Sequence, residues 1–384
     1  MYARNSLTIA NFFVAISSTL VSYTLLSYLS TFISGVNIGF AIAAGGVVAV
    51  VAFLFLPPLV MRYGPQQLAL FVTFIEMVML FAVAASPGTI ASAILVILVL
   101  ALQPVVYYQL DLLLEATVSN EGTTGRVRTF FLTGGNVGVL VAPLLIGALM
   151  ASGENYTIIF MSAAAVLMPL VVLFAMRRLP QGETPERFPI RDTIRHIAHD
   201  RDLAAVTIGH FILYLFYIWA PLYIPVYLHS VLGIPWSTLG WMFSVMLLPY
   251  VIIEYPAGWV ADRILGDKEM MLAGFIIAGS ALAAVSLLTA TSTPFIILSV
   301  LVATRVGAAL VESMTEGHFF RRVSEKDIVS VSVFRGVWPL TDALAPLIGS
   351  AILIFGNYQL FFVVTGGFVL VTGVVSTLFI RDFR

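Results

Sequence analysis

The sequence RRLPQGETPERFPIRDTIRHIAHDRD, residues 177–202, is the only long polar run in a chain of 384 residues. It contains six Arg, five Asp or Glu and three Pro, and it separates two long blocks that are almost continuously apolar. Each block is long enough for six membrane-spanning helices. The sequence therefore predicts an N-terminal six-helix bundle at 1–176, a cytoplasmic hinge loop at 177–202 and a C-terminal six-helix bundle at 203–384.

Apolar residues inside the hinge have helical spacing. Pro189 can begin a helix, and Ile190, Ile194 and Ile197 then fall on one face. We predict a short amphipathic helix that lies along the cytoplasmic surface of the membrane.

The overall composition places the chain in a membrane. Hydrophobic residues make up 60% of it and charged residues 10%, with a mean hydropathy of +1.02, whereas soluble domains are far more polar. A spanning helix needs about 20 apolar residues, and long continuous runs indicate helices, since barrel strands are short and alternating. We predict an all-α membrane protein of twelve transmembrane helices. The predicted spans are residues 5–32, 36–61, 67–86, 89–117, 126–150, 155–176, 203–229, 236–261, 270–290, 294–317, 328–354 and 358–380.

The positions of lysine and arginine predict the orientation of these spans. With the N-terminus in the cytoplasm, all of the 19 basic residues except Arg305 and Arg335 fall in or beside cytoplasmic segments, and the opposite loops contain none. Positive charge is enriched in cytoplasmic loops, so both termini are predicted to lie inside a cell (inner or plasma) membrane. The net charge of −1 argues against a nucleic-acid partner, and the absence of Cys excludes disulfides and thiolate metal sites.

Ionisable residues inside the predicted spans are functional candidates, because a carboxylate at the bilayer centre costs at least about 2.5 kcal/mol. Arg305 and Asp342 are the deepest charges of the second half, and opposite charges at this depth can neutralise each other. We predict that Asp342 or Glu312 exchanges a proton while Arg305 serves as a movable counter-charge. The alternative for each group is a packing or gating role. The predicted coupling and charge network consists of Asp342, Glu312, Arg305, Glu254, His210 and Glu76.

Aromatic and amide side chains at span depth are candidates for a substrate cavity. His210, Tyr214 and Tyr217 lie on one stripe of the seventh span, deeper than the tyrosines near its outer end, where interfacial aromatic residues are expected in any case. Ring stacking and hydroxyl hydrogen bonds from such residues suit an organic solute. The residues predicted to line the cavity are Tyr107, Tyr108, Asn136, Tyr214, Tyr217 and Trp338.

Short motifs of the first block recur in the second at a nearly constant offset. Residues 142–144 and 345–347 both read Ala-Pro-Leu, at an offset of 203, and Arg62 and Arg263, at an offset of 201, each close the second span of their half. A shared offset indicates an internal repeat, and two repeated six-helix halves describe a transporter with a midplane site. Dense Gly and Pro make a helix that packs closely and bends. The predicted helix-bending residues are Gly138, Pro143, Gly147 and Pro346.

The chain resembles the major facilitator superfamily over essentially its whole length. Residues 258–268 are similar to the family's cytoplasmic signature, Gly-x-x-x-Asp-Arg-x-x-Gly followed by basic residues, and they lie between the eighth and ninth spans as in the family. The resemblance implies that Asp262 and Arg263 help to hold the outward-facing state by docking on a neighbouring helix end. It also implies that spans 1, 4, 7 and 10 line the cavity.

The first-half copy of this signature is degraded. Arg62 and Gly64 remain between the second and third spans, but Met61 stands where the family has Asp. Asp111 and Glu115 share one helical face near the cytoplasmic end of the fourth span, which favours a gate rather than a substrate contact. The predicted gate and signature residues are Gly258, Asp262, Arg263, Gly266, Arg62, Gly64, Asp111, Glu115, Glu316 and Arg335.

The fifth span resembles the antiporter signature of drug-exporting members of the family. Gly138, Pro143 and Gly147 are in place, whereas Ala142 and Ile146 stand where glycines are expected. The Arg that such exporters often carry in the fourth span is absent. The resemblance favours export only slightly.

We therefore predict a secondary active transporter that moves a small organic solute by alternating access, works as a monomer in the lipid bilayer and is not an enzyme. The sequence contains no nucleotide-binding loop of the type Gly-x-x-x-x-Gly-Lys-Ser/Thr, so an ion gradient without any cofactor is the expected energy source. Protons are the first choice; sodium coupling and uniport are alternatives. Efflux by antiport is slightly favoured over uptake or uniport of a polar metabolite such as a sugar or organic acid. A membrane sensor or enzyme without transport is the remote alternative.

Overall fold

The structure is a computed structural model of the chain. It describes residues 2–33, 35–117, 124–177, 179, 195, 197–323, 330, 333–334 and 336–381. Within these ranges, the side chains of residues 2, 35–36, 54, 57, 115, 124–129, 254–255 and 262 are not described. Most of the predicted hinge therefore lies outside the described residues, although residues 195 and 197–199 of its predicted amphipathic helix are described and helical.

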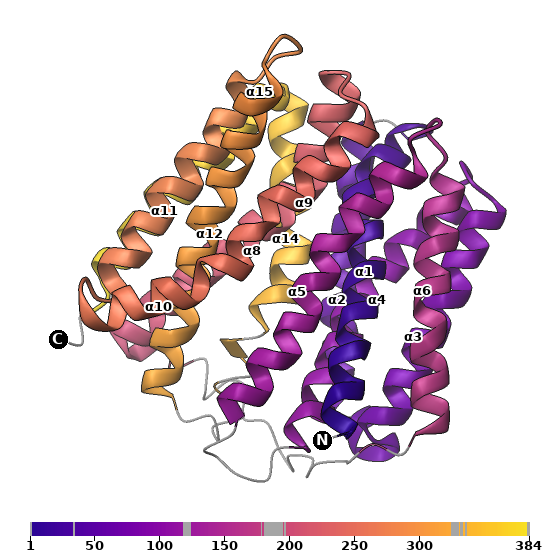
Figure 1. The fold of residues 1–384 in the computed structure, drawn as a ribbon, viewed down its shortest axis with the longest axis horizontal. Coiled ribbons are helices and arrows are strands. Elements are labelled where there is room, and N and C mark those ends of the chain that lie inside the picture. Colours follow the sequence, from indigo (N-terminus) through magenta and orange to yellow (C-terminus); the bar gives the residue numbers. More distant parts are fainter. Residues whose placement is uncertain are drawn as a thin grey trace. The chain divides into compact units, whose positions relative to one another are not determined.

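In the described part of the chain, six helices precede the hinge (Figure 1). Their ends follow from the local sequence: Thr89 caps a helix by accepting a hydrogen bond from the Ser92 N–H. Gly64, with φ 79°, makes the sharp turn after which Pro65 begins the next helix. The six helices are α1 (Tyr2–Ser30), α2 (Gly35–Tyr63), α3 (Pro65–Ala85), α4 (Ile90–Glu115), α5 (Thr124–Leu149) and α6 (Tyr156–Met176).

The helices after the hinge follow the predicted spans, except that the helix of the span predicted at 328–354 begins at Val337 instead of 328 and that one span is divided. The predicted span 236–261 forms two helices that are separated at Ile253. The physical reason is Pro256, which has no N–H to donate to the carbonyl of Ile252. The elements are α8 (Arg201–Val226), the π-helix η2 (Tyr227–Val231), α9 (Trp236–Ile252), α10 (Glu254–Arg263), α11 (Asp267–Ala284), the 3-10 turn η3 (Val285–Leu287), α12 (Pro294–Arg322), α14 (Val337–Phe355) and α15 (Tyr358–Leu378).

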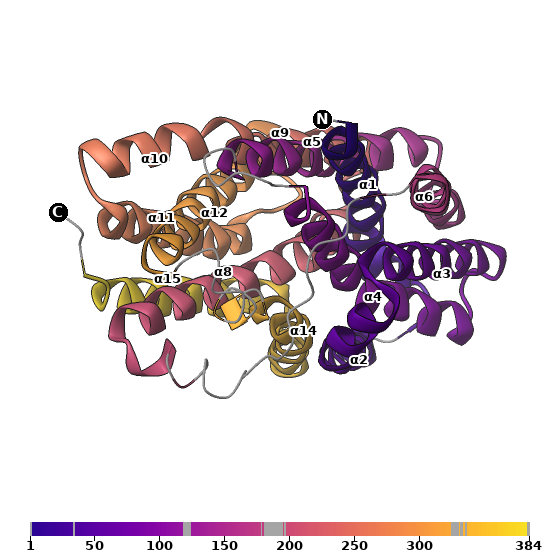
Figure 2. The ribbon, with the colours of Figure 1, turned by 90° about the horizontal axis from the view of Figure 1, so that it is seen from below.

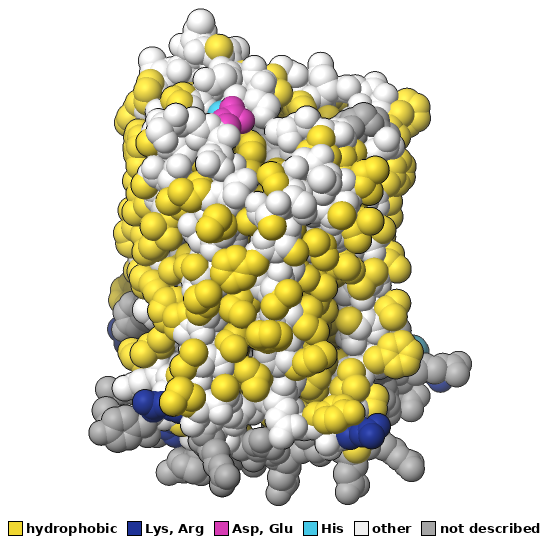
Figure 3. Space-filling view, turned by 90° about the vertical axis from the view of Figure 1, so that its right-hand side faces the viewer, with side chains coloured by type: hydrophobic (Ala, Val, Ile, Leu, Met, Phe, Trp, Pro, Cys, Tyr) yellow, Lys and Arg dark blue, Asp and Glu magenta, His cyan; other side chains and the backbone are white. Residues whose placement is uncertain are grey.

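The described helices have the length and composition of membrane spans. Ten of them are long and apolar enough to cross a membrane, and Asn37–Phe53 and Trp236–Ile252 are shorter apolar helices. Hydrophobic side chains cover the middle of the face shown in Figure 3, whereas the visible Lys and Arg side chains lie at its lower edge. The predicted all-α, multi-pass membrane class is confirmed, while the cytoplasmic position of both termini stays a prediction.

By their contacts, the residues fall into two compact units. Unit 1 comprises Met1–Thr184 and Pro221–Ser244, and unit 2 comprises Pro185–Ala220 and Val245–Arg384. The chain passes from one unit to the other within α8 and within α9. The predicted halves at 1–176 and 203–384, which concern the order of the spans along the chain, stay a prediction.

Close approach of helix backbones at glycine organises unit 1. Helix α1 packs against α4, α5 and α6 (Figure 2). A Cβ atom added at Gly138 of α5 would lie 2.4 Å from the carbonyl oxygen of Phe12 in α1. Gly147, nearer the end of α5, faces Gly240 of α9, where an added Cβ would lie 2.7 Å from the Gly147 Cα. Only residues without a side chain allow these contacts.

Unit 2 uses the same device around α11, which packs against α12 and α15. A Cβ added at Gly307 of α12 would lie 2.3 Å from the backbone nitrogen of Ala278. One at Gly366 of α15 would lie 2.4 Å from the backbone nitrogen of Ala283. Both faces of α11 are therefore backbone-to-backbone interfaces.

Candidate functional site

Unit 2 brings several of the predicted cavity residues together. The hydroxyl of Tyr217 on α8 donates a hydrogen bond of 2.5 Å to Oε2 of Glu312 on α12. The Tyr214 ring lies 5.6 Å from the Tyr217 ring and 6.3 Å from that of Trp338, measured between centroids. Tyr250 of α9 meets Tyr217 edge-on at 6.0 Å. Tyr214, Tyr217, Tyr250 and Trp338 thus form an aromatic wall, and the Glu312 side chain is hydrogen-bonded to it.

His210, two turns before Tyr217 on α8, is in contact with aromatic rings. It stacks on Phe334 at a centroid distance of 3.8 Å and an interplanar angle of 21°, and it lies 4.5 Å from Tyr214. Its exposed fraction is 1%. The predicted stripe of α8 is thus one continuous series of contacts from His210 to Tyr217.

The two deep charges of unit 2 have different surroundings. Arg305 of α12 is 2% exposed, and its guanidinium carbon lies 5.2 Å from the centroid of the Phe216 ring, within the range of a cation–π contact. Asp342 of α14 is half-buried, and its carboxyl group accepts a hydrogen bond from the side chain of Trp338 one turn earlier. A contact between Arg305 and Asp342 stays a prediction, and the Glu254 side chain lies outside the description.

Unit 1 holds the remaining predicted cavity residues, which do not all meet. The Tyr107 hydroxyl lies 2.9 Å from Oγ of Ser18 in α1, and the carboxyl group of Glu76 in α3 lies nearby. Tyr108 turns the other way, with its ring 5.7 Å from that of Phe53 in α2. Asn136 lies half-buried on α5. Glu76 is 3% exposed, and its Oε1 has no hydrogen-bond partner within the described part of the chain.

In the two signature turns, a glycine adopts a backbone conformation with positive φ and an arginine contacts an aromatic ring. Gly64 and Gly266 have φ values of 79° and 105° and stand directly before α3 and α11, a conformation that favours glycine. Arg62 lies over the ring of Tyr63 at 5.2 Å, and Arg263 lies over Trp259 at 5.3 Å. The two turns are therefore alike in backbone and in the cation–aromatic pair.

The other predicted gate residues are more scattered. An added Cβ at Gly258 meets no atom within 4 Å, so close packing does not require glycine there. Asp111 on α4 and Glu316 on α12 are half-buried. Arg335 lies outside the described residues, as do the side chains of Asp262 and Glu115.

A buried ion-pair cluster in unit 2 contains residues that the predicted site does not. His318 on α12 places Nδ1 3.1 Å from Oδ2 of Asp267 and Nε2 3.0 Å from Oδ2 of Asp202. Arg321 pairs with Asp267, and Arg322 pairs with Asp202. A neutral imidazole has a single N–H, so two carboxylate contacts suit the doubly protonated ring. His318 is 1% exposed.

This cluster joins four segments that are distant in sequence. Asp202 is the second residue of α8, Asp267 begins α11 and His318 belongs to the last turns of α12. The backbone N–H of Arg381, beyond α15, donates to Oδ1 of Asp202 over 2.7 Å. The spacing of His318, Arg321 and Arg322, at i, i+3 and i+4, is a sequence signal for a shared helical face, but it does not identify the partners.

We expect the substitution His318→Ala to lower the free energy of unfolding by about 2 kcal/mol, because two buried carboxylates lose a shared charged hydrogen-bond donor while each keeps its Arg partner. Thermal and denaturant unfolding of the purified protein in detergent measures the effect. The control is His229→Ala in unit 1, since His229 pairs with a Glu154 side chain that is 53% exposed, and surface pairs contribute at most about 1 kcal/mol. Equal losses in the two variants would contradict a special role for His318.

Comparison with solved structures defines the fold. The crystal structure of nucleoside transporter NupG aligns with a TM-score of 0.75 and 16% identity, covering 99% of each chain, and a mutant of NupG aligns with a TM-score of 0.76. The crystal structure of peptide transporter POT in complex with sulfate aligns with a TM-score of 0.75 and 14% identity over 97% of this chain and 93% of that chain. The fold is that of multi-pass membrane transporters.

One family model matches the second half of the chain. The model of the Major Facilitator Superfamily matches residues 206–383, and no curated protein matches the chain in sequence. The second half of the chain is thus similar in sequence to the Major Facilitator Superfamily, and the whole chain has the fold of the aligned transporters.

Proposed function

We propose that this protein is a secondary transporter of the major facilitator superfamily that couples the movement of a small organic solute to protons by alternating access. The observation that carries the proposal is the hydrogen bond from Tyr217 to Glu312. A carboxyl group within a spanning helix is a functional group by default, and here it is attached to an aromatic wall that suits an organic solute. Solute and proton thus have adjacent binding groups in unit 2.

Glu312 is the proposed proton-exchanging group, with Asp342 as its counterpart on α14. The Tyr217 hydroxyl stabilises the carboxylate form of Glu312 by donating to it. Arg305 lies two turns earlier on α12 and serves as the counter-charge that favours ionisation. In unit 1, Glu76 next to Tyr107 is a further group that can carry a proton. No cofactor is involved, and the energy comes from the proton gradient.

The proposed solute carries a planar ring. The Tyr214 ring lies 5.6 Å from the Tyr217 ring and 6.3 Å from the Trp338 ring, between centroids. These rings offer faces and edges to a planar solute, and aromatic pairs prefer such offset or edge-on contacts. Two transporters of the same fold are described as a nucleoside transporter and a peptide transporter, which supports an organic solute without selecting one.

Export by antiport is the proposed direction, supported by the glycine and proline pattern of α5. Proton-coupled uptake and uniport of a polar metabolite are the alternatives. We further propose that both termini lie in the cytoplasm, that the repeated halves are 1–176 and 203–384, and that the protein functions as a monomer in the bilayer.

Proton flux in proteoliposomes tests the coupling. A pH-sensitive dye is enclosed, and nucleosides, dipeptides, aromatic drugs, sugars and organic acids are added one at a time. We expect a pH change with at least one ring-containing compound, and its sign gives antiport or symport. Solute exchange without any pH change would contradict proton coupling.

The substitution Asp342→Asn is expected to lower this solute-driven pH change by about tenfold or more, because an amide cannot exchange a proton. Binding of the same solute, measured by calorimetry, serves as the control for folding and is expected to persist. An unchanged pH signal in Asp342→Asn would exclude Asp342 from the coupling mechanism.

A further inference from the structure

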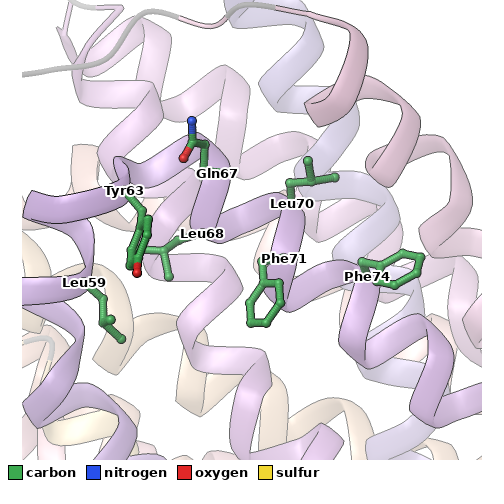
Figure 4. A pocket seen from close by; sticks show the side chains of 7 residues that line it. All are labelled: Leu59, Tyr63, Gln67, Leu68, Leu70, Phe71 and Phe74. Atoms are coloured by element: carbon green, nitrogen blue, oxygen red, sulfur yellow. The ribbon is translucent and has the colours of Figure 1, made fainter.

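An apolar groove lies on unit 1 between the end of α2 and the start of α3. It has a volume of about 710 Å³ and is lined by Leu59, Tyr63, Gln67, Leu68, Leu70, Phe71 and Phe74. Figure 4 shows the Tyr63 ring beside Leu68, with Phe71 and Phe74 further along α3. The volume is within the range of about 300–1,000 Å³ that is usual for ligand sites.

The side chains of the groove are open to the surroundings of the protein. Phe71 is 62% exposed and Phe74 is 47% exposed, and most of the wall is hydrocarbon or ring surface. The polar side chains of its lining are Gln67 and Tyr63, whose positions in the chain flank the turn at Gly64. The groove is therefore apolar along α3 and has polar residues at the end formed by this turn, as an amphipathic ligand requires.

A cation stands at this polar end. The guanidinium group of Arg62 lies 5.2 Å from the centroid of the Tyr63 ring, and the Arg62 side chain is exposed. Basic residues mark the same end of unit 1: Arg4 donates to the carbonyl of Thr117 beyond α4, and the carbonyl of Arg177 beyond α6 accepts from Gln66 in the first turn of α3. Positive charge marks the cytoplasmic side, where the leaflet contains the anionic lipids.

We propose that this groove binds an anionic phospholipid of the cytoplasmic leaflet. One acyl chain lies along Leu59, Phe71 and Phe74, and the phosphate group meets Arg62 and the Tyr63 hydroxyl. Arg62 supplies charge complementarity, since a basic residue near an anionic surface favours the charged lipid. The site is independent of the solute and of proton coupling.

The absence of Cys from the chain allows a site-specific test. A bimane fluorophore is attached to Phe74→Cys, and the protein is reconstituted in zwitterionic phosphatidylcholine with increasing amounts of chain-nitroxide phosphatidylglycerol or phosphatidylcholine. The matched control is Met168→Cys on α6, because Met168 is 46% exposed and Phe74 is 47% exposed. We expect half-maximal quenching at Phe74→Cys at about fivefold less phosphatidylglycerol than phosphatidylcholine, and no such preference at Met168→Cys.

Substitutions at Arg62 decide whether charge selects the lipid. In the Phe74→Cys background, Arg62→Gln is expected to abolish the preference and Arg62→Lys to retain most of it. Equal quenching by the two lipids, or a preference that survives Arg62→Gln, would overturn the proposal. So would energy transfer between donor and acceptor labels at Phe74→Cys on different molecules, since a second copy of the chain would then occupy the groove.

Discussion

The substitution Glu312→Gln is expected to reduce solute-driven proton flux by about a hundredfold or more, the scale on which removal of a proton-transferring group acts. The amide preserves the size of the side chain and still accepts the hydrogen bond from Tyr217, so the aromatic wall stays in place. It cannot ionise, and the proposed exchange of a proton at this position is lost. The dye assay in proteoliposomes measures the flux.

Tyr217→Phe is the matched control for Glu312→Gln. It removes the hydroxyl that donates to Oε2 of Glu312 over 2.5 Å but leaves the carboxyl group, so proton flux continues and its pH profile shifts to higher pH as the carboxylate loses its donor. Proton flux at the unsubstituted rate in Glu312→Gln would show that Glu312 belongs to packing. In that case the aromatic wall alone would remain as the solute site.

Gly366→Val is expected to prevent stable folding of unit 2. A Cβ at this position of α15 would lie 2.4 Å from the backbone nitrogen and 2.8 Å from the Cα of Ala283 in α11. Overpacking usually costs about 1–3 kcal/mol because side chains yield, and backbone atoms of a helix cannot, so we expect a cost above about 3 kcal/mol. Yield and unfolding temperature in detergent measure it.

The neighbouring residue provides the control for this substitution. A Cβ at Gly367, on the same helix, meets no atom within 4 Å, and Gly and Val differ by only a few tenths of a kcal/mol in helix propensity. Gly367→Val is therefore expected to fold with an unfolding temperature near that of the unsubstituted protein. Similar behaviour of the two variants would mean that α11 and α15 are not in backbone contact.

The spans were predictable because each depends on a local property, the length of an apolar run. The end of α2 at Tyr63 and the start of α3 at Pro65 follow from Gly64 and from Pro65 itself. The break at Ile253 is also local, since Pro256 is visible in the sequence, but hydropathy alone does not register a missing N–H.

The pairing of site residues depends on contacts across the fold. Tyr217 and Glu312 are both predicted as site residues, yet the hydrogen bond between them joins positions 95 residues apart, and no periodicity specifies it. The cluster around His318 is harder to predict, because its carboxylates come from the first turns of two other helices. Gly366 and Gly367 look alike in sequence, but a side chain at Gly366 would point into α11, whereas one at Gly367 would meet no atom within 4 Å.

The turns at Gly64 and Gly266 are alike in backbone conformation but differ in the side chains around them. If the halves arose by duplication of one ancestral gene segment, Gly64 and Gly266 are two copies of one corner that have kept their left-handed geometry, with φ values of 79° and 105°. The residues at the corresponding signature position, Met61 before Gly64 and Asp262 before Gly266, differ in charge. On that origin, both halves would have inherited the same backbone corner, and only the second would carry the acidic group that accompanies it.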